Sequence, residues 1–146
     1  MIRSCRILTV LAVLGICSCS RSGERLNPVV GKVFFKGQPA TKALVIFHSR
    51  DDPDAVKARA TVEKDGSFRA YTYVAADGVK AGDYDVTVVG WKKRPQRNPD
   101  KSQPKGNKEP PGIELPARYE NPKTSKLRVQ IIEGRNELPT FYLEPK

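Results

Sequence analysis

The chain has few of the residues that most often carry catalysis or hold metal ions. Its 146 residues include one histidine, His48, and three cysteines, all of which lie within the first 19 positions. A zinc site needs several histidine, cysteine or carboxylate ligands, and a histidine-dependent catalytic triad would have to rely on His48 alone. We therefore expect a protein without enzymatic activity, cofactor or metal ion.

A long apolar run is missing as well. The N-terminal apolar stretch covers residues 7–16 and follows the positive charges of Arg3 and Arg6, whereas a helix that crosses a bilayer needs about 20 apolar residues. A positive start, a short apolar stretch and then small residues are typical of a secretory signal. We predict a cleaved signal peptide over residues 1–18, followed by a lipid-bearing N-terminus and tether over residues 19–28.

The segment Ile16-Cys17-Ser18-Cys19 resembles the lipobox of bacterial lipoproteins, in which an aliphatic residue and two small residues precede an acylated cysteine. Cys19 fits the acylated position because Ser18 before it is small, whereas Cys17 follows the bulky Ile16. The resemblance implies an exported protein that is held on the bacterial cell membrane or outer membrane through Cys19. An ordinary secretory signal with incidental cysteines is the alternative. Cleavage and acylation would leave no free thiol for a disulfide, a metal ion or catalysis.

Positive charge is concentrated in one segment of the chain. The formal net charge is +10, and removal of Arg3 and Arg6 with the signal peptide lowers it to +8. Residues 92–108 account for +6 of this charge, because they hold one acidic residue, Asp100, and seven basic ones. The basic residues are Lys92, Lys93, Arg94, Arg97, Lys101, Lys105 and Lys108.

These seven cations are the best candidate for a binding surface. Clusters of Lys and Arg attract the phosphate and carboxylate groups of lipid headgroups, envelope polymers or acidic proteins. Nucleic acid needs the same cations, but an exported and anchored protein would rarely meet it. The alternative is a solvated loop that only keeps the protein soluble.

The rest of the chain predicts an all-β fold. Short β-branched and aromatic runs alternate with turn residues, which is typical of a sandwich. Tyr84, Val86 and Val88 should face the core, and Pro139 predicts an edge or a bulge. No stretch has a helical period, so we expect one mainly antiparallel β-sandwich of about seven strands within residues 29–146. The expected strands cover residues 29–35, 43–48, 57–62, 67–73, 84–89, 127–132 and 137–143.

Three connections between these strands have distinct compositions. Asp65-Gly66 predicts a tight hairpin because glycine accepts a positive φ. Residues 92–112 contain five prolines and no Ile, Leu, Val or Phe. They cannot bury enough apolar area to offset the entropy of ordering, so we expect a basic, Pro-rich loop without regular structure. The acidic run at Asp51, Asp52 and Asp54 lacks the spacing of a calcium-binding EF-hand and predicts a solvated turn.

Three short motifs resemble those of carboxypeptidase regulatory-like domains, in the transthyretin-like and collagen-adhesin B-type group of sandwiches. They are Val30-Gly31-Lys32-Val33, Asp65-Gly66-Ser67-Phe68 and Gly82-Asp83-Tyr84-Asp85-Val86. The resemblance implies an accessory β-sandwich without catalytic residues of its own, and hence a binding or structural module that contacts envelope components. A carrier of a small hydrophobic ligand is the alternative.

The adhesin branch of this group adds one further implication. Its internal isopeptide bonds join a lysine of the first strand to an asparagine of the last, and Lys32 or Lys36 and Asn136 occupy roughly such places. The competing interpretation is that Asn136 serves its own turn, because asparagine tolerates the left-handed conformation.

Overall fold

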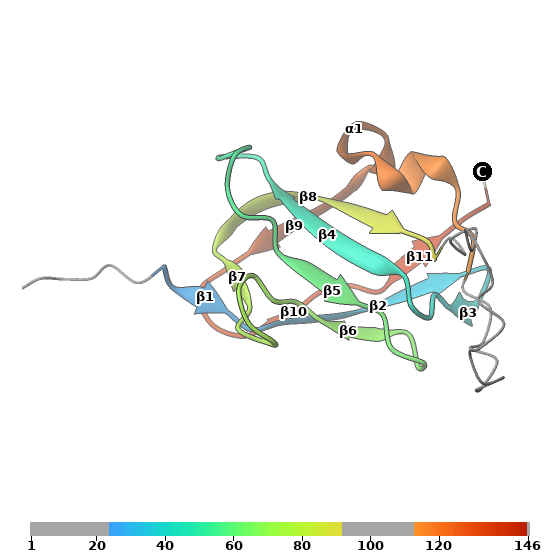
Figure 1. Ribbon diagram of the computed structural model, residues 1–146, viewed down its shortest axis with the longest axis horizontal. Helices are drawn as coiled ribbons and strands as arrows, with labels where there is room; N and C mark the ends of the chain where they lie inside the picture. Colours follow the sequence, from blue (N-terminus) through green and yellow to red (C-terminus); the bar gives the residue numbers. More distant parts are fainter. Residues whose placement is uncertain (1–23, 92–112, 146) are drawn as a thin grey trace, which may run out of the picture.

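The computed structural model describes residues 24–91 and 113–145 of the chain. These residues form eleven β-strands and two short helical segments (Figure 1). Most of the strand pairs are antiparallel, so the predicted mainly β fold with mainly antiparallel sheets is confirmed. No helix in these two ranges is long and apolar enough to cross a membrane.

Two larger sheets and one small sheet make up the fold. The four-stranded sheet is antiparallel and has the order β5 (Arg59–Thr61), β4 (Leu44–Ser49), β8 (Gly82–Val89) and β9 (Leu127–Ile131). The five-stranded sheet is built around β2 (Val29–Phe35). Its antiparallel partners are β3 (Gln38–Pro39) and β6 (Ser67–Arg69), and its parallel partners are β10 (Asn136–Glu137) and β11 (Phe141–Leu143). The small sheet pairs β1 (Leu26–Asn27) with β7 (Val79–Lys80).

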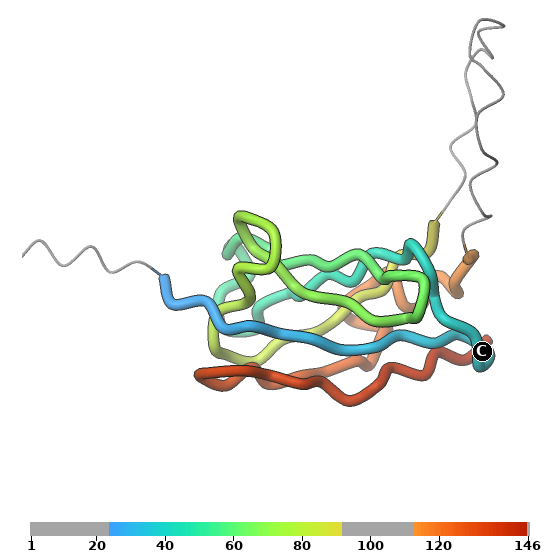
Figure 2. The backbone as a smooth tube through the Cα atoms, turned by 90° about the horizontal axis from the view of Figure 1, so that it is seen from below, coloured from blue at the N-terminus to red at the C-terminus, as the bar shows by residue number. Residues whose placement is uncertain are grey.

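The facing sides of the two larger sheets share one hydrophobic core. Val33 of β2 and Val45 and Phe47 of β4 are fully buried. The ring of Phe68 on β6 lies 6.3 Å from that of Phe47 and 6.3 Å from that of Phe141, measured between ring centroids. Figure 2 shows the two layers edge-on. Burial of these apolar side chains supplies the main driving force for folding.

Six of the seven expected strands are present, three of them shorter than predicted, and the seventh, over residues 137–143, is divided into β10 and β11. Tyr84, Val86 and Val88 face the core as expected, and Arg59 and Thr61 of β5 are exposed. Pro139 separates β10 from β11 because proline has no N–H to donate to a neighbouring strand. The additional strands β1, β3 and β7 have two residues each, which is too short to show an alternating pattern.

The predicted hairpin at Asp65-Gly66 is confirmed, because Arg59 before the turn and Tyr71 after it exchange two backbone hydrogen bonds of 2.8 Å in an antiparallel bridge. The turn is present, and the Glu63 N–H donates to the Ser67 carbonyl over 2.8 Å. The other edge of β5 pairs with β4 in the four-stranded sheet, whereas the other edge of β6 pairs with β2. A local turn signal predicts a reversal of the chain, but the partner of each strand depends on distant residues.

The predicted tether over residues 19–28 extends too far. Leu26–Asn27 form β1, which pairs with β7, and Asn27 is only 3% exposed. The Asn27 side chain donates to the Val79 carbonyl over 3.3 Å and accepts from the Gly134 N–H over 2.8 Å. Two residues are too few for a periodic pattern, so this strand could not be recognised in the sequence.

The expectation of no helix is also wrong. A 3₁₀-helix, η1 (Ala117–Glu120), is followed by a single α-helical turn, α1 (Pro122–Ser125). The Asn121 side chain accepts a hydrogen bond from the Lys123 N–H over 2.9 Å and caps α1. Both segments pack against β8, and four residues are too few to show a helical period.

Candidate functional site

The site residues predicted from the sequence lie outside the described residues. These are Cys19 and the seven cations of residues 92–108. The structure does describe the residues that flank them, which are Glu24 on the C-terminal side of Cys19, and Trp91 and Ile113 on either side of residues 92–112. The positions of these flanking residues constrain what the predicted sites can do.

The base of residues 92–112 is a tight backbone contact. A Cβ atom on Gly90 would lie 2.6 Å from the Ile113 carbonyl oxygen and 2.8 Å from the Leu115 nitrogen. Leu115 is buried against the core, and the Lys42 ammonium lies 5.5 Å from the centroid of the Trp91 ring. The two chain ends that carry the basic segment are therefore held side by side.

The N-terminal strand and this base lie at opposite ends of the fold. β1 is at one end of the long axis, whereas the C-terminal end of β8 and the chain that enters η1 are at the other (Figures 1 and 2). The chain that links Cys19 to β1 and the chain that carries the cations therefore leave the folded part in different places.

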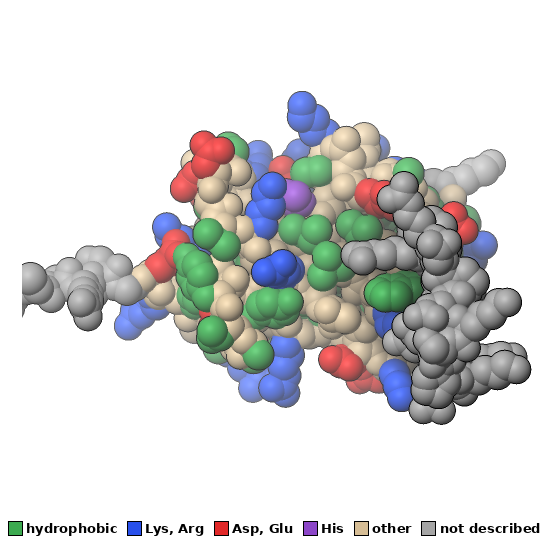
Figure 3. Space-filling model, viewed as in Figure 1, with side chains coloured by type: hydrophobic (Ala, Val, Ile, Leu, Met, Phe, Trp, Pro, Cys, Tyr) green, Lys and Arg blue, Asp and Glu red, His purple; other side chains and the backbone are tan. Residues whose placement is uncertain are grey.

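The only histidine of the chain lies on the outer face of the four-stranded sheet, among basic and hydrophobic side chains (Figure 3). His48 Nε2 is 2.9 Å from Thr87 Oγ1. Burial and, to a lesser degree, the positive charge of Lys57 lower the pKa of His48, while Asp85 opposes them. Thr87 is 1% exposed, so its hydroxyl cannot reach a substrate. This pair does not form a nucleophile with its base.

Asp85 lies opposite His48 on the neighbouring strand but serves another role. One of its carboxylate oxygens accepts a hydrogen bond from Arg128 Nε over 3.3 Å, and the other lies 4.0 Å from Arg50 Nε. This carboxylate on β8 links Arg128 of β9 to Arg50, the residue that follows β4. The result is an ion-pair network at a partly exposed site, which stabilises the sheet modestly.

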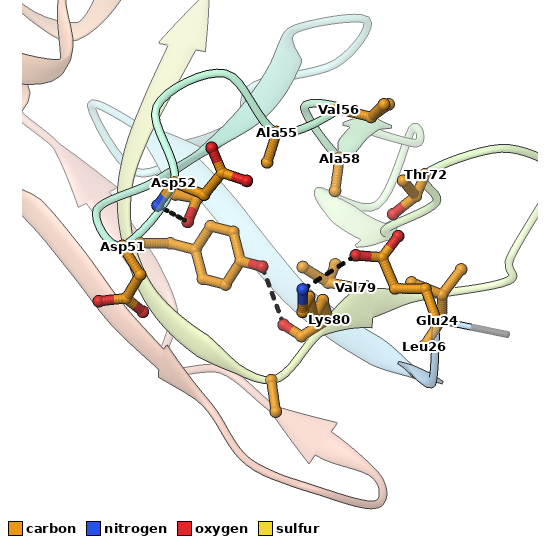
Figure 4. A pocket seen from close by; sticks show the side chains of 13 residues that line it. Glu24, Leu26, Asp51, Asp52, Ala55, Val56, Ala58, Thr72, Val79 and Lys80 are labelled. Atoms are coloured by element: carbon orange, nitrogen blue, oxygen red, sulfur yellow. Dashed lines mark hydrogen bonds and ion pairs between the residues drawn. The ribbon is translucent and has the colours of Figure 1, made fainter. Parts of the chain in front are cut away.

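A small pocket lies at the N-terminal end of the fold (Figure 4). It has a volume of about 70 Å³ and is lined by side chains from β1, β7 and the turn after β4, including Leu26, Val79 and Asp51. Ligand pockets usually measure about 300–1,000 Å³. The pocket has room for a few water molecules and none for a ligand of drug size.

Glu24 ties the N-terminal end to this pocket. Its carboxylate accepts a hydrogen bond from the Tyr73 hydroxyl over 2.6 Å and lies 3.2 Å from the Lys80 ammonium. The hydrogen bond from Tyr73, followed by that from Lys80, lowers the pKa of Glu24, and the pKa of Tyr73 rises in turn. Glu24 is therefore ionised at neutral pH and holds the start of the described chain against the turn at Tyr73.

A basic groove was missed by the sequence reasoning. It lies between α1 and the β8–β9 edge, has a volume of about 600 Å³, and is open to solvent. Lys123, Lys126 and Arg128 line it together with Asp85 and Pro122. The three cations lie close together in the sequence, but Asp85 precedes them by 38 to 43 positions, so no local pattern brings it beside them.

Two further residue groups have structural explanations. The Asp54 N–H donates to Asp52 Oδ1 over 3.2 Å, so the acidic run closes its own turn. Within residues 24–91 and 113–145, no three His, Cys, Asp or Glu side chains are grouped so as to hold a metal ion.

The Asn136 amide donates to the carbonyls of Ile132 and Gly134, both over 2.9 Å. Asn136 thus closes the turn between β9 and β10.

Comparison of the chain with protein-family models, with curated proteins and with solved structures gave no match.

Proposed function

We propose that this chain is a non-enzymatic envelope lipoprotein, anchored through an acylated Cys19 and carrying a β-sandwich of the carboxypeptidase regulatory-like, transthyretin-like type. Its partner is an anionic component of the bacterial envelope, which it binds through the basic residues between Lys92 and Lys108. The protein thereby connects a membrane surface to that component.

The observation that carries this proposal is the position of the described stretches that flank the two proposed attachment points. β1 lies at one end of the long axis, and the base of the basic segment, at Gly90 and Ile113, lies at the other (Figures 1 and 2). A fold anchored through its N-terminus holds this base on its membrane-distal side. This geometry favours an envelope polymer or an acidic protein over the headgroups of the anchoring membrane.

The distribution of charge supports the same division of roles. The described residues hold 15 Lys and Arg against 14 Asp and Glu, which gives a net charge of +1. Residues 92–112 hold seven against two, which gives +5. The folded part has little net attraction for a polyanion, so the basic segment dominates any electrostatic binding.

The environment of the only histidine supports a role other than catalysis. His48 is hydrogen-bonded to the buried Thr87 hydroxyl, and the nearby Asp85 is engaged by two arginines. General base catalysis needs a base within reach of a reacting group in an accessible cleft. The hydroxyl beside His48 belongs to Thr87, which is 1% exposed, so it is not in an accessible cleft.

The anchor is tested by replacing Cys19 with serine. The C19S variant should leave the membrane fraction and become soluble at high salt, whereas the wild-type protein should stay with membranes at every salt concentration. A C19S variant that still sediments with membranes at high salt would show that acylation of Cys19 is not the anchor.

The binding segment is tested by neutralising four of its cations in the C19S background. The variant K92Q/K93Q/R94Q/R97Q should leave isolated envelopes at a lower salt concentration than its parent, because it neutralises fewer anionic groups and so releases fewer counterions on binding. The control K32Q/K36Q/K64Q/R69Q removes four exposed cations from the folded part and should leave the release point unchanged. An equal shift of the release point in both variants would contradict the assignment to residues 92–108. Binding of the C19S protein to anionic lipid vesicles as strong as its binding to isolated envelopes would identify headgroups as the partner.

A further inference from the structure

Two turns near Glu24 expose three large apolar side chains at the N-terminal end of the fold. Val56 is 59% exposed, Tyr73 58% and Val74 66%. They come from two turns, one between β4 and β5 and the other between β6 and β7, and both turns lie at the end that carries β1 (Figure 1). We refer to these three residues as the apolar tip.

The apolar tip is fixed to the start of the described chain. Tyr73 donates its hydroxyl hydrogen bond to Glu24, and Val56 lines the same small pocket as Glu24 and Leu26. The turn beneath Tyr73 and Val74 is itself held, because both of their backbone N–H groups donate to the Asp77 carboxylate over 2.9 Å. The exposure of these side chains is therefore built into the fold.

The position of the tip identifies what covers it. Glu24 follows Cys19 by five residues, and five residues of extended chain span at most about 18 Å. Acylation of Cys19 would place the lipid surface within that distance of the tip. Exposed apolar clusters mark contact sites, and tyrosine with valine suits the boundary between headgroups and acyl chains.

The charges around the tip indicate which lipid surface it fits. Glu24, Asp51 and Asp52 line the adjoining pocket with Lys80 as the one cation among them. A strongly anionic membrane would repel this acidic surround, whereas a zwitterionic headgroup region would not. The contact therefore depends on apolar burial and not on attraction between charges.

We infer that the apolar tip of Val56, Tyr73 and Val74 rests in the interface of the anchoring bilayer and sets the orientation of the fold. This inference relies on the proposed anchor at Cys19. The long axis then stands away from the membrane, and the base of the basic segment faces the opposite direction.

The orientation can be tested without native acylation. Cys19 is the only cysteine within residues 19–146, so a maleimide lipid can be coupled to it and the protein bound to phosphatidylcholine vesicles that carry nitroxide-labelled acyl chains. In the W91F/V74W variant the indole reports on the tip, whereas in the wild type the 46% exposed Trp91 reports on the opposite end. Quenching by the nitroxides should be several times stronger in W91F/V74W than in the wild type.

A matched control separates contact from exposure. The W91F/Y142W variant places its indole at Tyr142, which is 72% exposed on β11 and is not part of the tip; its quenching should match that of Trp91. A second tip variant, W91F/V56W, guards against local damage from V74W and should be quenched as W91F/V74W is. Equal quenching at all positions would overturn the inference. It would also be overturned if the indole of Trp91 or of the Y142W variant were quenched more strongly than both tip indoles. Because the lipid is attached chemically, this result is independent of the C19S fractionation, which tests the anchor itself.

Discussion

At the scale of single residues, Gly31 is required by close packing and not by its backbone conformation. It lies in β2, and a Cβ atom there would be 2.5 Å from Cζ of Phe68. The G31A variant should lower the free energy of unfolding by about 1–3 kcal/mol, the usual cost of overpacking a core. Urea unfolding with an unchanged slope measures this loss.

A second substitution identifies the cause of that loss. F68L removes the ring edge that the new methyl group meets, so the G31A/F68L double variant should lose less stability than the two single variants added together. Gly37 serves as the control, because no atom lies within 4 Å of a Cβ there although its φ is +76°. F68L should add to G37A without interaction, and additivity in the G31A pair would contradict the packing explanation.

His48 makes stability depend on pH near neutrality. Its pKa in the folded state lies below the ordinary value, first because of burial and then because of Lys57. The folded state therefore disfavours the protonated imidazole, so this contribution to stability is complete above about pH 6.5 and is lost as the pH falls through the lowered pKa. The free energy of unfolding should decline over that range in the wild type.

Substitution of His48 isolates this effect. The H48Q variant keeps a hydrogen-bonding group near Thr87 and should show a flatter profile just below pH 6.5. The carboxylates of Asp65 and Asp77 have lowered pKa values, so their losses begin below about pH 4 and remain in both proteins. If the free energy of unfolding declines equally in H48Q and the wild type between about pH 6.5 and pH 4, the effect belongs to another group.

At the scale of elements, the turn between β6 and β7 depends on one carboxylate. Asp77 accepts hydrogen bonds from the backbone N–H groups of Thr72, Tyr73 and Val74 at 2.7–2.9 Å. Desolvation raises the pKa of Asp77, but these backbone hydrogen bonds outweigh it and the net pKa is lowered. The D77N side chain places an NH₂ group where a carboxylate oxygen accepts backbone hydrogen bonds. The variant should be destabilised by about 1 kcal/mol, because water replaces part of the lost hydrogen bonding at this exposed turn.

The loss in D77N should be local before it is global. Amide hydrogen exchange should accelerate at Thr72, Tyr73 and Val74 more than in the strands of the four-stranded sheet, because turns open at lower free energy than core strands. D65N is a suitable comparison, since Asp65 holds a different turn through the Ser67 N–H over 3.0 Å. Uniform acceleration in D77N would mean that Asp77 supports the whole fold.

The elements that the sequence predicted well are those with a side-chain alternation long enough to see. β2 and β8 have seven and eight residues, and their buried faces follow the apolar pattern. β1 and β7 have two residues each and owe their pairing partly to the Asn27 side chain. The parallel pairing of β2 with β10 and β11 is likewise invisible to a local pattern, because it joins residues about 107 positions apart.

At the scale of the whole molecule, the folded part should not need the basic segment. The backbone contact of Gly90 with Ile113 already holds the two ends of residues 92–112 together. Replacing these residues with a short Gly-Ser connector should leave the unfolding temperature unchanged or higher, since each halving of a flexible loop gains about 0.6 kcal/mol. A large drop in the unfolding temperature would show that the segment is part of the core structure.

Counting charges was enough to find the basic segment, but its direction could not be predicted. Seven cations in residues 92–108 are plain in the sequence. That their base lies opposite β1 follows from the path of β8 along the long axis (Figure 1). The basic groove depends in the same way on the folded chain, because Lys123, Lys126 and Arg128 meet Asp85 only through the packing of α1 and β9 on β8.

The measurement that tests the account most directly is co-flotation of a polyanion with the anchored protein. Phosphatidylcholine vesicles that carry the acylated protein are mixed with fluorescent polyglutamate or polyphosphate and floated through a density gradient. We predict that the polyanion floats with the wild type, is released by salt, and stays at the bottom with the K92Q/K93Q/R94Q/R97Q variant, although that variant still floats. Equal flotation of the polyanion with both proteins, or with neither, would contradict the claim that the basic segment binds an anionic partner from a membrane anchor.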